Sequence, residues 1–222
     1  MSELTPPRRR RRRTDADRSA AAILRAATEI LAAQPHASVE EIAVGAGVSR
    51  QTVYAHFKSR EVLVSTVIDA ITSEAVSEMD AAALDEGPAA EALLRLLDAS
   101  WRTLQRYPLL LSTLTAAAGT EAKDTRHETV FDHLDQVLKR GQERGEFARD
   151  LPTTWLARAI VALGHAAGGE VTTGRITLPD AAEALARSTL RMCGADPSTI
   201  DDLVDRRGGI GGPPSTAAQA WE

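Results

Sequence analysis

The chain has 222 residues, 43% of them hydrophobic and only 4% aromatic, which allows one or two domains with a sizeable core and favours helices packed on helices over a β-sandwich. Its one cysteine, Cys193, excludes an intrachain disulfide, and no apolar run approaches the ~18 residues that a membrane span needs. We therefore expect a cytoplasmic protein that has no membrane partner.

The net charge of −5 is unevenly distributed along the chain. Residues 1–66 carry eleven Arg or Lys and seven Asp or Glu, a net charge of +4, so the remaining residues carry −9. Six consecutive arginines, Arg8, Arg9, Arg10, Arg11, Arg12 and Arg13, stand near the start. This asymmetry predicts that the N-terminal residues bind a polyanion and that the acidic remainder of the chain has a different partner.

The whole chain lacks β alternation of useful length, and prolines and glycines divide it into segments of helical length. We therefore predict an all-α fold of about nine or ten helices. An apolar stripe over residues 23–31 predicts a first helix that begins near Asp15 and ends before Pro35. Ser38 and Glu41 form a capping box at the start of a short second helix.

Gly47 ends this second helix in a tight turn, and Ser49 caps a third helix over residues 50–56. Ser59 then opens a long helix, and five more helices follow Gly87, Pro108, residue 122, Pro152 and Pro179. We divide the chain into a disordered Arg-rich arm (1–14), a helical N-terminal domain (15–60), a helical body (61–205) and a flexible tail (206–222).

The segment 41–64, EIAVGAGVSRQTVYAHFKSREVLV, holds two short helices joined by a glycine turn. This is helix-turn-helix geometry, although an ordinary helical hairpin remains an alternative. Apolar residues would hold the two helices together, which leaves an outward row that suits a DNA major groove: Arg50, Gln51, Thr52, Tyr54 and His56. Ser38 and Lys58 stand where contacts with phosphate are expected, and Tyr54 and His56 have packing roles as alternatives.

The run I42-A43-x-x-A46-G47-V48-S49-x-x-T52-V53-Y54-x-H56-F57-x-S59-x-E61-x-L63, preceded by I23-L24-x-A26-A27, resembles the DNA-binding domain of the tetracycline-repressor (TetR) family. Gly45 departs from that pattern, since a polar or larger residue is more usual there. The resemblance implies three DNA-binding helices, a long connecting helix, and a helical body that binds a small effector and dimerises through its last two helices. It implies no cofactor and no metal.

For the body, the resemblance suggests two sets of candidate residues. An apolar effector would contact bulky residues on facing helices, for which plain core packing is the alternative: Met79, Trp101, Leu104, Tyr107, Leu114, His127, Phe131 and Trp155. A partner subunit would pack on the small and apolar residues of the last two helices: Ile160, Gly164, His165, Gly168, Leu185 and Met192.

The sequence therefore predicts a homodimeric, ligand-responsive repressor that binds double-stranded DNA at a palindromic operator. The arginine run serves either as an arm that contacts DNA or as a solvated tail. Two other classes remain open: a DNA-bound architectural or protein-partner module without an effector, and a small helical enzyme that retains the fold. Against the enzyme, the sequence has no nucleophile elbow, P-loop or zinc-protease motif.

Overall fold

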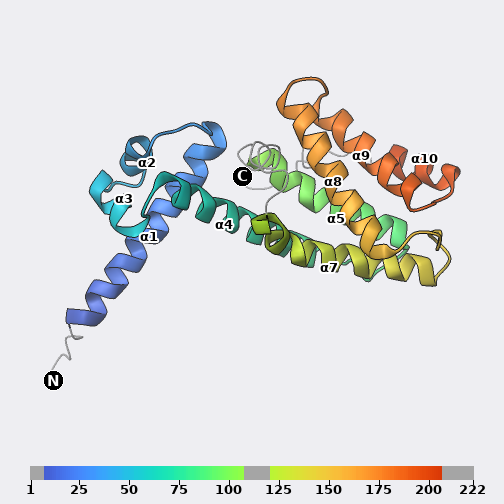
Figure 1. The fold of residues 1–222 in the computed structure, drawn as a ribbon, viewed down its shortest axis with the longest axis horizontal. Helices are drawn as coiled ribbons and strands as arrows, with labels where there is room; N and C mark the ends of the chain where they lie inside the picture. The colour runs from blue at the N-terminus through green and yellow to red at the C-terminus, as the bar shows by residue number, and fades with distance from the viewer. Residues whose placement is uncertain (1–7, 108–120, 207–222) are drawn as a thin grey trace, which may run out of the picture. The chain divides into compact units, whose positions relative to one another are not determined.

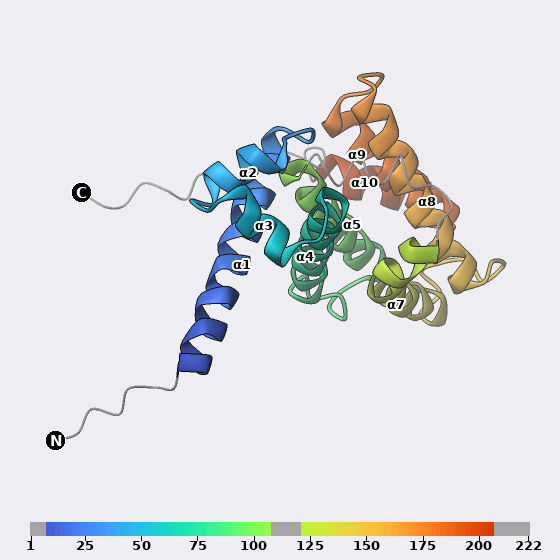
Figure 2. The same cartoon turned by 60° about the vertical axis from the view of Figure 1, so that its left-hand side comes forward.

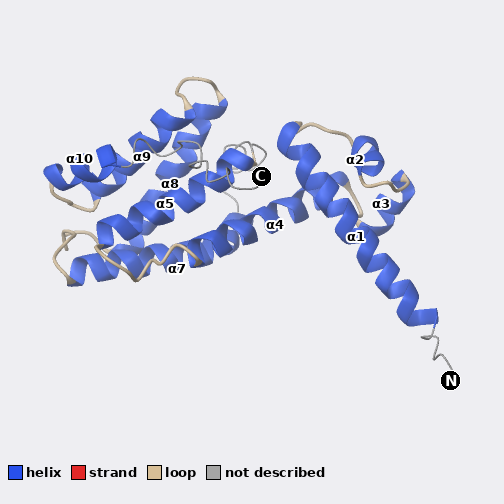
Figure 3. Ribbon diagram, turned by 180° about the vertical axis from the view of Figure 1, so that it is seen from behind, coloured by secondary structure: helices blue, strands red, loops and turns tan. Residues whose placement is uncertain are grey.

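The computed structural model describes residues 8–107 and 121–206, and it describes the side chains of residues 17–107 and 128–206. These residues form α-helices joined by turns and loops, with no strand among them (Figure 3). The all-α prediction is confirmed. The predicted short helix after Pro108, residues 1–7 of the predicted arm and the predicted tail beyond Arg206 lie outside the described residues.

The described chain divides into two compact units, and the division falls within the long fourth helix. The first unit contains α1 (Arg8–Ala33), α2 (Val39–Gly45), α3 (Arg50–His56) and the part of α4 (Arg60–Asp80) up to Thr72. The second contains the rest of α4 and the helices that follow it (Figure 1). The sequence placed the boundary at the start of α4, twelve residues earlier than this division.

Helix α1 starts at Arg8, before the predicted start near Asp15. The segment predicted as a disordered arm is therefore helical from Arg8 onward. The high helix propensity of arginine favours this extension, whereas the repulsion between like charges and the positive end of the helix dipole oppose it. Figures 1 and 2 both show that this N-terminal part of α1 continues past α2 and α3, so its backbone is not covered by the other helices of the first unit.

The core of the first unit joins one face of each of its helices. Helices α2 and α3 pack on α1 and on each other. The predicted apolar stripe of α1 supplies Ile23, Ala27 and Leu31, each with no exposed surface. The other helices contribute the remaining buried residues: Ile42 and Ala43 from α2, Val53 from α3, Phe57 after it, and Leu63 and Val67 from α4. This packing fixes which face of α3 is left outside.

The second unit packs α5 (Ala89–Arg106), α7 (Glu121–Glu143), α8 (Thr153–Thr172), α9 (Leu178–Met192) and α10 (Pro197–Arg206). Helices α5 and α8 each contact both α7 and α9, and α10 contacts α9 (Figure 1). The last turns of α5 also meet α4, because Arg102 and Arg106 form ion pairs with Glu78 and Glu74. None of the described helices is long and apolar enough to cross a membrane.

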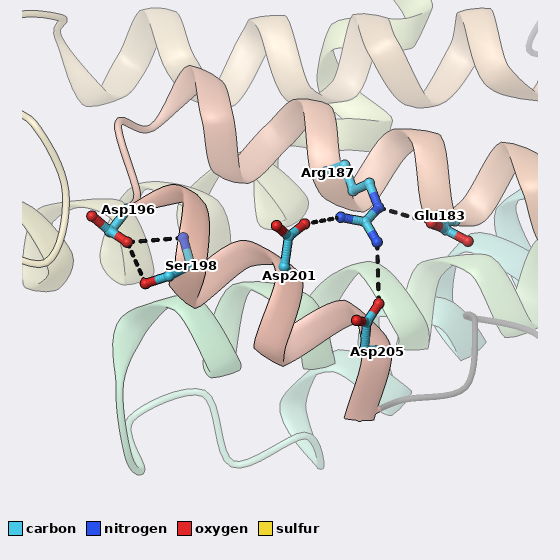
Figure 4. A network of polar contacts seen from close by, with 6 residues as sticks. All are labelled: Glu183, Arg187, Asp196, Ser198, Asp201 and Asp205. Atoms are coloured by element: carbon cyan, nitrogen blue, oxygen red, sulfur yellow. Dashed lines mark hydrogen bonds and ion pairs between the residues drawn. The ribbon is translucent and has the colours of Figure 1, made fainter.

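Helix α10 was missed by the sequence analysis, although the signal for it is present. Asp196 accepts hydrogen bonds from the amide and hydroxyl of Ser198 and so caps the helix start, and buried Ile200, Leu203 and Val204 follow at helical spacing. Figure 4 shows how the helix is attached to α9: Arg187 of α9 binds Asp201 at 2.6 Å and Asp205 at 3.3 Å, in addition to Glu183 on its own helix.

Candidate nucleic-acid interface

The two short helices of the candidate interface begin at the predicted caps. The Ser38 hydroxyl accepts the amide of Glu41 at 3.2 Å, while the Glu41 carboxylate accepts the Ser38 amide at 2.7 Å. These contacts complete the capping box, and they lower the pKa of Glu41 below its ordinary value. Ser49 caps α3 by accepting the amide of Thr52 at 3.1 Å. Both helix starts are therefore fixed by local side chains.

Gly47 sets the angle between α2 and α3. Its φ of +66° lies in the left-handed region that glycine adopts without strain. The amide of Val48 bonds to the carbonyl of Ala43 at 3.0 Å, and the amide of Gly47 bonds to the carbonyl of Val44 at 3.1 Å. This pair of bonds is the Schellman motif, which ends α2 and directs the chain into α3.

The predicted outward row lies on the accessible side of α3. Val53 is the only α3 residue that is buried. The predicted contact residues are all accessible: Arg50, Gln51 and Tyr54 are exposed, as is Lys58 just beyond the helix, while Thr52 and His56 are half-buried. A short helix with this row of long polar side chains on its free face can enter a major groove.

Arg50 is the most organised member of this row. Its guanidinium lies over the ring of Tyr54, with Cζ 5.5 Å from the ring centroid, and Nη1 is 3.8 Å from a carboxylate oxygen of Glu40. Tyr54 first and Glu40 to a lesser degree raise the pKa of Arg50. Glu40 comes from α2 and was not among the predicted residues, because its partner is ten positions away on another helix.

Two residues that are predicted to contact DNA already use their hydroxyl groups in hydrogen bonds within the protein. The Ser38 hydroxyl donates to Glu41 at 2.7 Å, and the Thr52 hydroxyl lies 2.8 Å from the hydroxyl of Ser49. A hydroxyl has one proton to donate, so Ser38 would have to release Glu41 before it could donate to a phosphate. Ser38 is therefore first a capping residue in this structure, whereas Gln51 and Lys58 extend from exposed positions.

Arg60 links the start of α4 to the loop before α2, a role that the sequence analysis did not predict. Its guanidinium donates to the carbonyl of Pro35 at 3.1 Å and to that of Ala37 at 3.2 Å. Because Ala37 directly precedes Ser38, these bonds fix the chain where it enters α2. A planar guanidinium suits two such acceptors because its donors form a rigid fork.

The predicted effector residues occupy three kinds of place. Met79, Trp101 and Leu104 are buried in the second unit, and Tyr107 and Phe131 are half-buried. Trp155 is 53% exposed, contrary to its predicted place in a cavity. The buried side of α8 carries Leu156, Ala157 and Ile160, and this places Trp155 on the outer side of the helix. Leu114 and the side chain of His127 lie outside what the structure describes.

Of the predicted interface residues, half are buried in the single chain and half are only partly covered. Ile160, Gly168 and Leu185 are buried within the single chain, and Gly164, His165 and Met192 are half-buried. The three buried residues have little surface left for a partner, whereas the three half-buried residues keep part of theirs. On the exposed face of α8, Trp155, Ala162 and Ala166 lie in one stripe because they are seven and four residues apart, and exposed Arg158 lies beside them.

No metal site is formed by the described part of the chain, where no three His, Cys, Asp or Glu side chains gather as metal ligands would. His133 pairs instead with Asp80, Nε2 to carboxylate oxygen 3.0 Å, which joins α7 to the end of α4.

Comparison with known proteins gives both sequence relatives and a structural likeness. Residues 23–67, which contain α2 and α3, match the family described as bacterial regulatory proteins, tetR family. In fold, the chain is similar to the TetR-like regulator LfrR from Mycobacterium smegmatis, solved in complex with proflavine, with a TM-score of 0.58 and 22% identity over 78% of this chain and 94% of that one.

The sequence relatives extend the likeness into the body. The chain is 32% identical over 157 residues to the transcriptional regulator EthR of Mycolicibacterium smegmatis, a match that covers 69% of this chain and 63% of that protein. It is 30% identical over 171 residues to EthR of Mycobacterium tuberculosis, covering 72% of this chain and 78% of the relative. The chain therefore belongs to the TetR family of bacterial transcriptional regulators.

Proposed function

We propose that the protein is a homodimeric repressor that binds a palindromic DNA operator and releases it when a small apolar effector binds the second unit. The observation that carries this proposal is the accessible row of α3, in which Arg50, Gln51 and Tyr54 are exposed on a helix fixed by a glycine turn. A bacterial regulator of this kind acts on the chromosome, in the cytoplasm.

The side chains of α3 have the chemistry for reading base pairs in a major groove. Arg50 can donate two parallel hydrogen bonds to guanine O6 and N7, and Gln51 can pair with the N6 and N7 edge of adenine. Lys58, exposed just beyond α3, suits a phosphate. Tyr54 can contact a phosphate with its hydroxyl while its ring supports Arg50.

Dimerisation follows from the need to contact both halves of a palindrome. Two recognition helices fit one face of the duplex when their half-site centres are ~34–36 Å apart. The exposed apolar stripe of α8, formed by Trp155, Ala162 and Ala166, supports a two-fold interface on that helix. Small residues allow a partner helix to approach closely, and Trp155 supplies a large apolar area at one end of the stripe.

Two features of the second unit support an effector site there. Trp101 is 2% exposed, and its indole N–H has no hydrogen-bond partner among the described residues, although buried indole donors usually have one. Gly164 is half-buried on α8, and a Cβ added there would meet no described atom within 4 Å, so a larger side chain has room at this position. An apolar molecule with one hydrogen-bond acceptor would suit both features, and the related LfrR was crystallised with proflavine.

Release of DNA requires effector binding in the second unit to be coupled to DNA binding by the first unit. Helix α4 runs without a break from the first unit, where Arg60 binds the loop before α2, into the second unit, where Glu74 and Glu78 pair with α5. An effector that favours another position of α4 must weaken DNA binding by the same factor by which DNA weakens effector binding.

Titrations of the full chain on an operator duplex and a scrambled duplex test the proposal. Arg50→Ala and Gln51→Ala should each lower discrimination between the duplexes by about 1–3 kcal/mol. Lys58→Ala should weaken binding to both duplexes alike. Unchanged discrimination in Arg50→Ala would contradict base reading by α3. For the effector site, Gly164→Leu should fill the room beside Gly164. A Gly164→Leu protein that binds the operator as wild type does, but is no longer released from it by the effector, would support an effector site in the second unit.

A further inference from the structure

Glu40 is an unusual residue for a surface that binds DNA, because its carboxylate stands within the face formed by α2 and α3. It is 67% exposed, and one oxygen lies 3.8 Å from Nη1 of Arg50, the foremost candidate for base reading. The next residue, Glu41, has a separate role because Ser38 holds its carboxylate in the capping box. Glu40 takes no part in that box, and its carboxylate faces Arg50 instead.

The Glu40–Arg50 pair contributes little to folding. At 3.8 Å it is an ion pair rather than a hydrogen bond, and both side chains are more than half exposed. Exposed pairs of this kind stabilise proteins by roughly 0–1 kcal/mol. The effect of Glu40 is therefore to be sought in what Arg50 binds rather than in the stability of α2 or α3.

The two ways in which Arg50 can meet DNA respond differently to Glu40. In base reading, guanine takes one edge of the guanidinium, and the remaining N–H groups can still face the carboxylate, since the group carries five donors in a fixed fork. In a phosphate contact, Arg50 must either leave Glu40 or bring a carboxylate next to a phosphate. The first option gives up the ion pair, and the second places like charges together.

Binding to non-cognate DNA depends on phosphate contacts, each of which adds about 0.9 to the slope of log K against log salt. A side chain that hinders such a contact at Arg50 must lower non-cognate binding more than operator binding. We propose that Glu40 is a specificity-determining residue, which acts by holding Arg50 over Tyr54 for a base edge and by keeping it from phosphates. This inference rests on the proposed function.

The test compares Glu40→Gln, which removes the charge and keeps the shape, with Glu29→Gln, which makes the same change at an exposed position of α1. On a scrambled duplex, Glu40→Gln should bind roughly three- to tenfold more tightly, and its salt slope should steepen by up to about 0.9, the value for one phosphate contact. On the operator the affinity should change by less than about twofold, so the ratio of the two affinities falls.

A double-mutant cycle shows whether Glu40 acts through Arg50. In the Arg50→Gln background, Glu40→Gln should leave the ratio of operator affinity to scrambled-duplex affinity unchanged, because the guanidinium that Glu40 restrains is absent. The inference is overturned if Glu40→Gln matches Glu29→Gln on both duplexes, if its effect persists without Arg50, or if it weakens the operator alone, which would make Glu40 a direct base contact. A wild-type chain that binds both duplexes equally would instead overturn the proposed function itself.

Discussion

The ring of Phe147 packs against the backbone of Gly141 in α7, so closely that a Cβ added to Gly141 would lie 2.5 Å from Cε2 of Phe147 and closer still to Cδ2. Phe147 is only 3% exposed, and Cγ of the same ring lies 2.9 Å from that position. Glycine within a helix costs about 1 kcal/mol relative to alanine. Here that cost allows the chain after α7 to fold back onto the helix.

We expect Gly141→Ala to lower the free energy of unfolding by about 1–3 kcal/mol, because a buried ring cannot move aside without strain. Gly45→Ala is the matched control. Its Cβ would meet the terminal methyl of Ile30 at 2.6 Å, the mobile end of a side chain, so we expect a change within about 1 kcal/mol. Urea denaturation followed by circular dichroism measures both, and equal stability of Gly141→Ala and wild type would contradict this packing argument.

A second prediction concerns pH and Cys193. Burial raises the pKa of the Cys193 thiol from 9.0 to about 12. Because the folded-state pKa is the higher one, the stabilisation is fully present below pH 9 and is lost as the pH rises from 9 towards 12. Over this window the contribution of Cys193 should fall by up to about 1.4 kcal/mol per pH unit.

Thiol labelling and alkaline denaturation test this prediction. A thiol reagent at pH 8 should react with Cys193 only as fast as the protein opens, and Cys193→Ala should be less stable than wild type at pH 8 but approach it by pH 11. Rapid labelling of the native protein would mean that the thiol is accessible.

The arginine run gives a third prediction. Replacing Arg8, Arg9, Arg10, Arg11, Arg12 and Arg13 by glutamine keeps good helix formers in α1 but removes six charges. If this part of α1 binds phosphates, DNA binding should weaken, and its salt slope should flatten by up to about 0.9 for each phosphate that the variant no longer neutralises. Sequence preference should change less. If the glutamine variant has the DNA affinity and the salt dependence of the wild type, the arginine run is a solvated extension that does not contact DNA.

The fourth prediction concerns assembly through α8. Ala166→Glu places a charge in the exposed stripe with Trp155, so we expect folded monomers that bind operator poorly. Gln136→Glu adds the same charge at an exposed position of α7 and should remain dimeric. Analytical ultracentrifugation distinguishes these outcomes. Dimers of unaltered affinity in Ala166→Glu would place the interface elsewhere.

The sequence predicted the helix-turn-helix well because its signals are local. A capping serine, a glycine turn and an apolar repeat each act within four or five residues, and the structure contains all three. The Glu40–Arg50 pair and the bonds from Arg60 to Pro35 and Ala37 were not predictable in this way. They join residues 10 to 25 positions apart, and they depend on how the helices are angled.

In the second unit, local sequence patterns predict still less of the packing. Bulky residues at helical spacing indicate that a helix is amphipathic, but the packing partners decide which of its faces points inward. Trp155 and Ile160 illustrate this on one helix, because the large aromatic residue is 53% exposed whereas the isoleucine is 2% exposed. Helix α10 was overlooked although Ile200, Leu203 and Val204 carry its periodicity, since a single short stripe is a weak signal.

The central claim, that α3 reads DNA sequence as part of a symmetric dimer, is tested most directly by selecting binding sites from random duplex DNA with the full chain. We predict enrichment of an inverted repeat whose half-site centres are about 10–10.5 base pairs or a multiple of that apart. We also predict that Arg50→Ala loses preference at a guanine within each half-site. A recovered pool with the composition of the input, or an enriched site that Arg50→Ala selects equally well, would contradict the claim.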